Sequence, residues 1–356
     1  MRAAYYEKNG PAREVLRVAE VETPQPGPGE VRVRLRTSGV NPSDVKGRAG
    51  TTRKIAFPRV IPHSDGAGEI DGVGEGVPAA RVGERVWVWN GQWRRPFGTA
   101  AQSIVLPAQQ AVALPSNVSL EAGACLGIPA YTGYQAVDIV GAKEGATVLV
   151  AAGAGAVGHY AIQFAKHRKA TVITTISSPA KAELARQAGA DHTIDYKREN
   201  VGERVMALTG KRGVDAVIEM DLAANARLLP GVLAPSGTVA IYGSGAPEAA
   251  LASEASGQRG DSILRAPDTR PELGSSARVS IPFQFLLQNS IALEFFLVYL
   301  MPREQRERAA AEITRMLERG ELIHNVAETF DLDDIVAAHE AVEAGQAMGN
   351  IVVRIG

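Results

Sequence analysis

Hydrophobic and polar residues alternate in short runs along the first third of the chain. Over residues 30–36 charged and apolar side chains alternate strictly, which predicts a β-strand with one face buried and one exposed. Comparable runs at 1–6, 16–21 and 82–88 are bounded by glycine, proline or asparagine. Many short strands separated by turn signals predict a compact, barrel-like β domain over residues 1 to about 125.

The pattern changes at Ser119, where alanine, glycine and helix-forming residues become common. Beyond it, short β-branched runs alternate with stretches of helical spacing. The expected strands are 147–151, 171–176, 191–194, 214–219 and 239–242, and the expected helices are 130–140, 179–188 and 202–209. Strands alternating with helices predict an α/β fold with a doubly wound parallel sheet.

Residues 247–279 break this alternation. They are mainly Ala, Ser, Gly, Glu, Arg and Pro, which predicts an irregular surface insertion. After it, the apolar run 290–300 fits the last strand of the sheet, a pocket wall or the edge of a dimer. An amphipathic helix is expected at 304–319, and a second helix and a final strand at 332–344 and 350–355.

The most specific motif follows the predicted strand 147–151. Gly153-Ala154-Gly155-Ala156-Val157-Gly158 opens a stretch with helical spacing. Strand, glycine turn and helix are the context in which G-x-G-x-x-G binds a dinucleotide. On this interpretation Gly153 permits the tight turn, Gly155 lets a pyrophosphate approach the backbone, and Gly158 brings helix against strand. The N–H groups and the positive dipole end of the helix then face the phosphates.

Composition and charge disfavour several classes of protein. The 356 residues suffice for about two domains, and a formal net charge of −1 provides no overall field to attract nucleic acid or an anionic membrane. No run approaches the roughly 18 apolar residues of a membrane span, and the first residues lack a signal-peptide core, which predicts a cytoplasmic protein. The single cysteine, Cys125, is expected to be a buried thiol.

Several motifs together resemble one family. They are Pro28-Gly29-Glu30-Val31, Gly39-Val40-Asn41-Pro42, Asp65-Gly66-Ala67-Gly68, Val82-Gly83-Glu84-Arg85-Val86, Ile128-Pro129-Ala130-Tyr131-Thr132, the glycine turn and Val217-Ile218-Glu219-Met220. In this order they resemble the zinc-independent quinone oxidoreductase (zeta-crystallin-like) branch of the medium-chain dehydrogenase/reductase superfamily. The resemblance implies a GroES-like catalytic domain (1–127 and 300–356), a Rossmann domain (128–299) and an active site between them.

The same resemblance predicts that no zinc is bound. Zinc-dependent relatives carry a catalytic cysteine where this chain has Asn41 and a zinc-binding histidine where it has Ser64, and one cysteine cannot build their four-cysteine lobe. His63 lies one position from the ligand register, with Asp65 nearby, but no second soft ligand accompanies it. A histidine in a polar loop is therefore preferred, and alcohol oxidation that requires a Lewis acid is disfavoured.

The residues after the strand 171–176 favour NADPH over NADH. NAD-specific folds usually place Asp or Glu about 20 residues beyond the glycine turn. This chain has Ser177, Ser178 and Lys181 there, whose hydroxyls and ammonium suit the 2′-phosphate of NADP. By resemblance, Lys181 and Tyr196 match positions that contact this phosphate. A helix cap at Ser178 with Lys181 in solvent is the simpler alternative, and it is compatible with phosphate binding.

For the reacting groups the resemblance is the main guide. It implies that Asn41 hydrogen-bonds ribose or substrate and that Thr132 touches the carboxamide end of the cofactor. The groove would be completed by Gly243, Ser244, Phe296 and Leu297. Where many relatives have a tyrosine, Lys46 either stabilises a developing anion or is a surface lysine. Candidate walls for a flat acceptor, each of which also fits a plain core role, are Trp93, Tyr131, Phe295 and Phe296.

Three functions remain open. The leading one is an NADPH-dependent reductase that transfers hydride to quinones or α,β-unsaturated carbonyls, with a proton from solvent. An enoyl-thioester reductase is the second, with Arg94 and Arg95 as phosphate ligands or a solvated pair. The third is an NADPH-binding structural or RNA-binding protein with little turnover, against which the near-neutral charge argues. By resemblance a homodimer or homotetramer is expected, with 291–300 as an edge strand.

Overall fold

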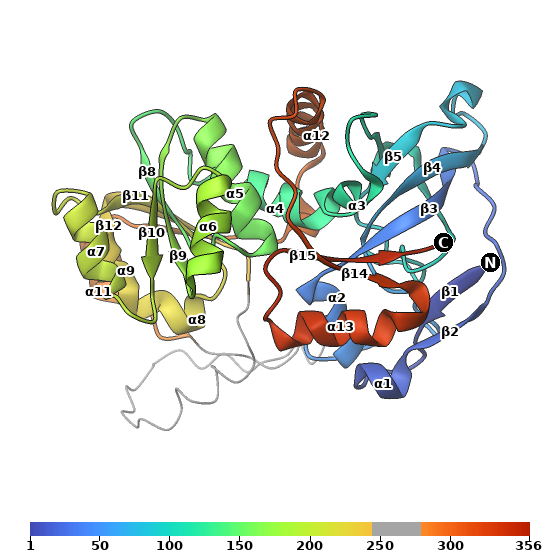
Figure 1. Cartoon of the computed structure of the whole chain (residues 1–356), viewed down its shortest axis with the longest axis horizontal. Coiled ribbons are helices and arrows are strands. Elements are labelled where there is room, and N and C mark those ends of the chain that lie inside the picture. The colour runs from blue at the N-terminus through green and yellow to red at the C-terminus, as the bar shows by residue number, and fades with distance from the viewer. Residues whose placement is uncertain (244–278) are drawn as a thin grey trace. The chain divides into compact units, whose positions relative to one another are not determined.

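The computed structural model describes residues 1–243 and 279–356, which form two compact units. Unit 1 comprises Met1–Gln135, Ala154–Tyr160 and Leu297–Gly356, and unit 2 comprises Ala136–Gly153 and Ala161–Phe296. The expected domain boundaries after 127 and 299 thus fall at 135 and 296. Except for Val279, the expected insertion 247–279 lies outside the described residues, as does the candidate site residue Ser244. Figure 1 shows both ends of the chain on unit 1.

Unit 1 is built on a seven-stranded sheet in the order β14-β15-β3-β4-β5-β7, with β6 paired to β3. Its strands are β3 (Glu30–Val40), β4 (Asp65–Val73), β5 (Arg85–Val88), β6 (Ser103–Pro107), β7 (Ala111–Ala113), β14 (Val326–Asp331) and β15 (Asn350–Arg354). A separate antiparallel pair is formed by β1 (Arg2–Tyr5) and β2 (Arg17–Glu20). All pairs within the large sheet are antiparallel except β14 with β15. The predicted β-rich domain is confirmed, and the end of the chain completes it.

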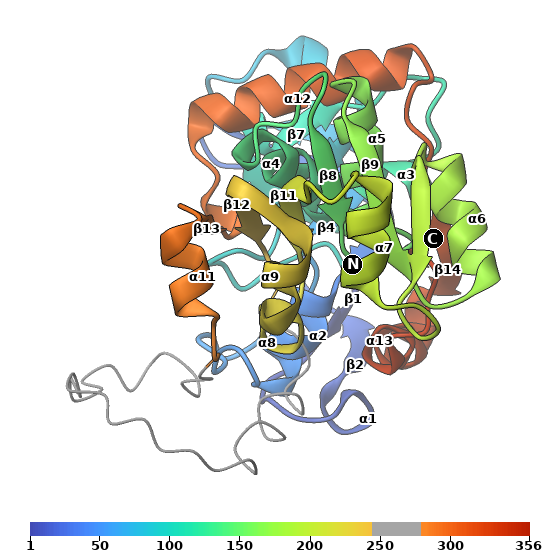
Figure 2. The ribbon, with the colours of Figure 1, turned by 90° about the vertical axis from the view of Figure 1, so that its left-hand side faces the viewer.

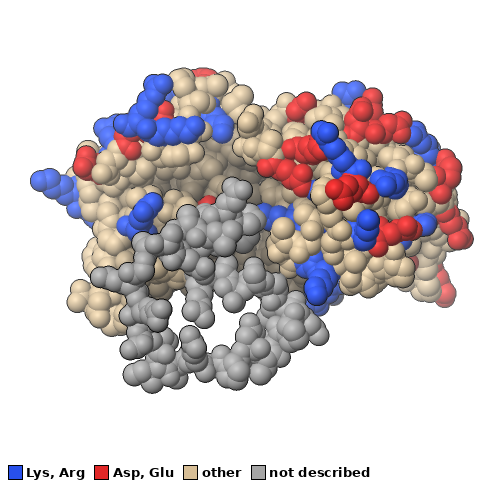
Figure 3. Space-filling model, turned by 90° about the horizontal axis from the view of Figure 1, so that it is seen from below, with Lys and Arg blue, Asp and Glu red and all other residues tan. Residues whose placement is uncertain are grey.

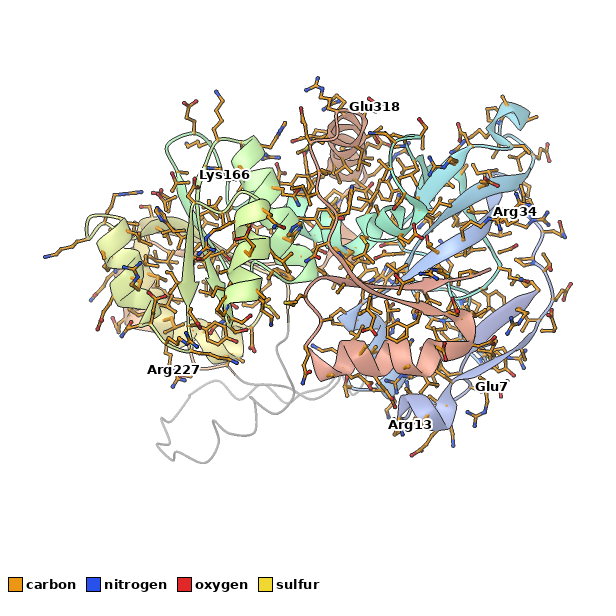
Figure 4. All side chains as sticks on the ribbon, in the orientation of Figure 1. Glu7, Arg13, Arg34, Lys166, Arg227 and Glu318 are labelled. Atoms are coloured by element: carbon orange, nitrogen blue, oxygen red, sulfur yellow. The ribbon has the colours of Figure 1, made fainter. Side chains whose placement is uncertain are left out.

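Strand β3 shows how the alternating sequence builds this unit. Val31, Val33 and Leu35 are at most 1% exposed and belong to the hydrophobic core. On the opposite face Arg34, labelled in Figure 4, pairs with Glu69 of the neighbouring β4 at 2.7 Å. The two-residue period predicted from the sequence is therefore observed in β3, where one set of alternate side chains faces the core and the other faces solvent.

The helices of unit 1 cover the ends and one side of its strands. They are α1 (Ala12–Val15), α2 (Pro42–Ala49), α3 (Leu120–Gly123), α12 (Arg303–Glu318) and α13 (Ile335–Ala344), with short turns η1 (Ala79–Arg81), η2 (Ala108–Gln110), η3 (Leu126–Ala130), η5 (Val298–Leu300) and η6 (Leu332–Asp334). The predicted apolar stripe of α12 is confirmed, because Ala309, Ile313 and Leu317 are buried. Helix α13 lies alongside α1 and α2 (Figure 1).

Unit 2 is a six-stranded sheet in the order β10-β9-β8-β11-β12-β13, and all five pairings are parallel. Its strands are β8 (Thr147–Val150), β9 (Thr171–Ile176), β10 (His192–Asp195), β11 (Val214–Glu219), β12 (Leu233–Ile241) and β13 (Ala292–Phe295). Its helices are α6 (Pro179–Gln187), α7 (Val201–Leu208), α8 (Leu222–Asn225), η4 (Ala226–Leu228), α9 (Leu229–Val232) and α11 (Phe283–Gln288). Helices α4 (Tyr131–Ile139) and α5 (Ala156–His167) have residues in both units. The views in Figures 1 and 2 place α5 beside β8 and β9, and the predicted doubly wound parallel sheet is confirmed.

Some elements carried no readable sequence signal. Strands β6, β7 and β14 and the helical turns between Leu222 and Val232 were not predicted. Strand β14 lies at the edge of its sheet and pairs only with β15, so its side chains are half-buried or exposed and form no apolar run. The apolar run 290–300 is the last sheet strand, but only over Ala292–Phe295, and it ends in η5.

The surface of the described residues carries charges of both signs. On the face shown in Figure 3, Lys and Arg side chains are interspersed with Asp and Glu. Many are paired, as Arg13 of α1 is with Glu340 of α13. Across 1–243 and 279–356, no helix is both long enough and apolar enough to cross a membrane.

Candidate functional site

The predicted cofactor residues of unit 2 lie at one edge of its sheet. Because all six strands are parallel, their carboxyl ends meet at the same edge. Gly153 follows β8, Ser177 follows β9, Tyr196 follows β10, and Phe296 follows β13, whereas the rest of the glycine turn, residues 154–158, belongs to unit 1. In the sheet, β9 lies on one side of β8 and β11 lies on the other. The strand order therefore reverses beside the glycine turn. Such a reversal is where open α/β sheets bind ligands.

Within the glycine turn, the left-handed residue is Ala152, with φ 55°, and not Gly153. Gly153 is needed for a different reason: an added Cβ would overlap Oγ1 of Thr174 on β9. That hydroxyl is fixed, because it donates to the carbonyl of Val150 at 2.7 Å. The expected role of Gly153 in the turn is therefore corrected to close packing of the turn on the neighbouring strand.

The end of β9 combines a helix cap with a set of polar groups. Oγ of Ser178 accepts from the backbone N–H of Lys181 at 3.3 Å, so the serine caps α6 as the simpler alternative required. Ser177 and Lys181 are half-buried, and no carboxylate occurs among residues 177–182. Tyr196 at the end of β10 is 53% exposed. This group of residues presents hydroxyls and one ammonium to the edge of the sheet.

The ends of β11 and β12 approach each other so closely that a side chain at Gly243 would overlap the carbonyl oxygen of Met220. Next to this contact, Glu219 is 3% exposed and accepts from the backbone N–H of Asp221 and from Nδ2 of Asn225 at 2.5 and 3.0 Å. Burial raises the pKa of Glu219. The Tyr242 ring lies 6.1 Å from that of Phe296, so an aromatic pair completes this part of the edge.

Unit 1 contributes a buried polar cluster where β3 runs into α2. Asn41 is 6% exposed; its Nδ2 donates to Oδ2 of Asp65 at 2.8 Å, and its backbone N–H donates to Oδ2 of Asp44 at 2.8 Å. Asp44 lies in the first turn of α2, and Asp65 begins β4. The predicted site residue Asn41 thus lies between two buried carboxyl groups.

Burial dominates the protonation of this cluster. It raises the pKa of Asp44 to about 7, against the opposing effects of the Asn41 N–H and Arg53. Burial likewise raises the pKa of Asp65 well above its usual range, and within 1–243 and 279–356 no hydrogen-bond partner is found for Oδ1 of that residue. The pKa of the buried Cys125 thiol is raised as well, first by burial and then by Asp65. The expected buried cysteine is confirmed.

The remaining predicted residues of unit 1 are placed differently. Lys46 is half-buried on α2, and Thr132 is 4% exposed at the start of α4. Leu297 is 43% exposed. Arg95 is no solvated residue: it donates to Oε1 of Gln110, and burial lowers the pKa of its guanidinium.

A cavity of ≈ 210 Å³ lies within unit 1. It is lined by Trp89, Asn90, Gln109, Val112, Tyr131, Tyr299, Met301, Arg303, Arg306, Glu307 and Ala310. Tyr299 links the cavity to the Asn41 cluster, because its hydroxyl bonds Oγ of Ser43 at 2.9 Å and its ring stacks on Trp93 at 4.5 Å. Two of the four predicted wall residues, Tyr131 and Trp93, therefore lie in or beside this cavity, whereas Phe295 is 66% exposed at the end of β13.

Comparison with known proteins decides the family. Residues 27–116 match the alcohol dehydrogenase GroES-like domain, and residues 156–264 match the zinc-binding dehydrogenase domain. The chain is 31% identical to the 2-haloacrylate reductase of a Burkholderia species, over 99% of this chain and 98% of the relative. It is also 31% identical to the quinone oxidoreductase of Pseudomonas aeruginosa, over 96% and 95%.

The chain is a medium-chain dehydrogenase/reductase. Within this oxidoreductase family it falls in the zinc-independent quinone oxidoreductase branch, as its motifs suggested. Among solved structures it is similar to an NAD-dependent alcohol dehydrogenase, with 28% identity and a TM-score of 0.83 over 100% of both chains. A mycobacterial protein complexed with NADPH has 28% identity and a TM-score of 0.81 over 99% of this chain and 100% of its own.

His63 departs from the interpretation as a residue of a polar loop. It is fully buried, with a left-handed φ of 77°, and its Nδ1 and Nε2 contact Oγ of Ser38 and Nε2 of His339 at 2.8 and 2.9 Å. Burial lowers its pKa to about 3, so the ring is neutral. Across the described parts of this medium-chain reductase, no three His, Cys, Asp or Glu side chains gather as metal ligands. The role of His63 is internal packing and hydrogen bonding.

Several residues of the site were missed from the sequence. Asp44 had a readable signal, because an acidic residue three positions after a cap commonly bonds the cap backbone. Trp89 and Arg306 come from distant segments and carry no local motif, whereas Tyr299 lies in the apolar run 290–300, for which a pocket wall was one of the alternatives. Glu219 was used only as a family marker, although its place at the end of a buried strand identifies it as a residue of the sheet edge.

Proposed function

We propose that this medium-chain reductase uses NADPH to transfer hydride to quinones or to C=C bonds conjugated to a carbonyl, without zinc. The observation that carries the cofactor preference is the end of β9, where Ser177, Ser178 and Lys181 stand and no carboxylate repels a phosphate. A mycobacterial structural relative is complexed with NADPH, which supports the proposal.

The residues at the sheet edge fit such a nucleotide. The turn Gly153–Gly158 and the N-terminus of α5 would hold the pyrophosphate, because that helix begins at Ala156 with its first N–H groups toward the edge. Lys181, Ser177 and Tyr196 would hold the 2′-phosphate. The nicotinamide end would be held by Thr132, Gly243, Ser244, Phe296 and Leu297. When bound, the cofactor supplies the hydride, and the chain binds, orients and excludes water.

For the acceptor, we propose that Asn41 directs an amide group toward ribose or substrate oxygen while its other contacts hold it in place. The bonds to Asp44 and Asp65 fix both its backbone and its side chain. Lys46, on the same helix α2, would stabilise a developing enolate or hydroquinone anion. The names of two relatives, a quinone oxidoreductase and a 2-haloacrylate reductase, support both acceptor classes.

A direct test follows the ultraviolet absorbance of the reduced nicotinamide with purified protein. NADPH and NADH would each be tried with an ortho-quinone, a para-quinone, an enone and an enoyl-thioester, with and without a strong zinc chelator. Chelator-resistant oxidation of NADPH, with NADH much poorer, supports the proposal. Preference for NADH contradicts the assignment at β9, and loss of activity with chelator contradicts the zinc-independent mechanism.

The enoyl-thioester alternative is weakened by the position of Arg95. A phosphopantetheine phosphate would need both Arg94 and Arg95. Arg95, however, donates to Gln110 and to the carbonyl of Val105. Arg94 lies with its guanidinium 5.3 Å from the ring of Trp93. Only one of the two arginines is left facing solvent, which is a poor phosphate patch.

We also propose self-association through β13. In the described sheet this strand pairs only with β12, and Leu287 and Phe295 near it are 62% and 66% exposed. An apolar edge strand of this kind pairs readily with a second copy. Light scattering should give a dimer or a multiple of it, and a Leu287→Glu variant should shift it toward the monomer; a monomeric native protein contradicts the proposal.

A further inference from the structure

The cavity of unit 1 contains polar groups that the fold leaves unsatisfied. Four of its lining residues each carry a buried side-chain atom that has no hydrogen-bond partner among the residues that the structure describes: Nε1 of Trp89, Oδ1 of Asn90, Oη of Tyr131 and Nη1 of Arg306. Buried polar atoms normally have a hydrogen-bond partner, because burying such an atom without one costs free energy. Three of these four groups are donors, so the missing partner is rich in acceptors.

The buried positive charge of Arg306 also favours a ligand that is rich in acceptors. Arg306 is 5% exposed, and its guanidinium lies 4.0 Å from the ring centre of Trp89 and 5.3 Å from that of Tyr131. Another nitrogen of this guanidinium, Nη2, donates to the carbonyl of Val298 at 2.8 Å, but among the described residues Arg306 forms no ion pair. A buried charge without a counter-ion is costly.

Glu307, the acidic residue of the lining, does not neutralise the charge of Arg306. Glu307 accepts from Nε of Arg303 at 2.7 Å, and both of these side chains are largely exposed. Arg303 and Glu307 at the rim of the cavity therefore neutralise each other, while the buried guanidinium of Arg306 keeps its positive charge. An anion that enters the cavity would find one permanent cation and two further donors.

We infer that this cavity binds the carboxylate group of a small acceptor, such as an α,β-unsaturated carboxylic acid, with Arg306 as its counter-ion. The inference rests on the proposed function for the identity of the acceptor. At ≈ 210 Å³ the cavity is smaller than the roughly 300–1,000 Å³ of drug-sized pockets, which suits an acid of a few carbons. Tyr299 forms one wall and bonds Ser43, two residues from Asn41, so the bound acid would lie next to the polar cluster.

Binding can be tested without turnover. Titration calorimetry of the full chain, without nucleotide, would compare acrylate and 2-chloroacrylate with acrylamide, which has nearly the same shape and no charge. We expect the carboxylates to bind and the amide to bind at least about tenfold more weakly, since it cannot pair with a guanidinium. Equal affinity for amide and carboxylate overturns the inference.

Variants assign the effect to the cavity. Arg306→Met should weaken acrylate binding by about 30-fold or more. Tyr131→Phe removes only a hydroxyl and should weaken it by about tenfold, which provides the test if the first variant does not fold. Arg308→Met, exposed on the same helix α12 and outside the lining of the cavity, is the matched control and should leave affinity within about twofold. Unchanged acrylate affinity in Arg306→Met or Tyr131→Phe overturns the site.

The outcome is separable from that of the proposed function. Acrylate binding that depends on Arg306 supports the inference even if no acceptor is reduced. Reduction of quinones by a protein that binds no acrylate overturns the inference and leaves the proposed function standing.

Discussion

The candidate site residues of the two units differ in kind. In unit 2 the edge of the sheet consists mainly of backbone N–H groups, glycines and hydroxyls, with one buried carboxyl group, that of Glu219. In unit 1 the cluster and the cavity consist of buried ionisable side chains, among them Asp44, Asp65 and Arg306. Four of the six histidines, each with a lowered pKa, also lie in unit 1: His63, His159, His324 and His339. The stability of unit 1 is therefore expected to depend strongly on pH, whereas the edge of unit 2 is expected to be sensitive to atoms added at its glycines.

The largest expected effect is the loss of unit 1 on acidification. A histidine whose folded pKa is depressed stabilises the fold above its unfolded pKa of about 6.5, and this contribution is lost as pH falls. At pH 5 each of the four histidines lowers the free energy of unfolding by about 2 kcal/mol. Together they lower it by about 8 kcal/mol as an upper bound. Asp44 and Asp65 act in the opposite sense, because their raised pKa values favour the protonated, acidic form, so the net loss is smaller.

The chain offers a built-in probe for this effect. All three tryptophans, Trp87, Trp89 and Trp93, lie in unit 1. On titration from pH 7 to 4, tryptophan fluorescence should report unfolding at higher pH than the far-ultraviolet circular dichroism of the whole chain. Coincident transitions would remove the distinction between the units.

The next effect is a gain in stability from Asp44→Asn. The pKa of Asp44 rises from 3.8 to about 7, so the folded state holds its proton between these values and carries the full penalty of ionisation above pH 7. The amide keeps an oxygen to accept the N–H of Asn41. Denaturant unfolding should show no gain near pH 4, growing to as much as about 4 kcal/mol at pH 8. A gain that is independent of pH would show that Asp44 is not buried as a neutral acid. Asp333→Asn, at an exposed position, is the control.

The difference between the units also decided what the sequence could predict. The edge of unit 2 follows from strand ends and a local glycine motif, so the positions of Ser177 and Lys181 could be predicted from their neighbours along the chain, whereas Gly243 was named only by family resemblance. The cavity of unit 1 brings together Trp89, Tyr131 and Arg306, which are separated by long stretches of chain and share no period. Asn41 was placed only by family resemblance, and its two carboxyl partners were not foreseen as a cluster.

An added methyl group should damage unit 2 selectively. In Gly153→Ala the new Cβ overlaps Oγ1 of Thr174, so the turn must shift, and a misplacement of this size can lower kcat/KM with NADPH about 100-fold. Adding Thr174→Ala removes the nearest of the overlapping atoms, leaving Cδ1 of Ile162 at 2.8 Å, and should restore part of the activity. Gly231→Ala meets no atom nearer than 3.7 Å and is the control. Wild-type kcat/KM in Gly153→Ala would mean that the turn is not part of the nucleotide site.

The smallest expected effect concerns the choice of nucleotide. Lys181→Ser removes the ammonium at the end of β9 and should raise KM for NADPH about tenfold while leaving KM for NADH unchanged. Lys143→Ser, also in unit 2 but exposed and away from the edge, should change neither. Equal loss with both nucleotides would assign Lys181 to the structure of α6 and not to the 2′-phosphate.

The pairing of β3 with β15 joins Val40 to Ile351 and so spans almost the whole chain. On the ribosome, unit 2 has all its strands once residue 296 has emerged, whereas unit 1 waits for β14 and β15. Until then, part of β3 presents an unpaired edge, which is a template for association with other nascent chains. The inserted unit can thus fold before the unit that surrounds it, and the last residues synthesised complete the sheet of unit 1.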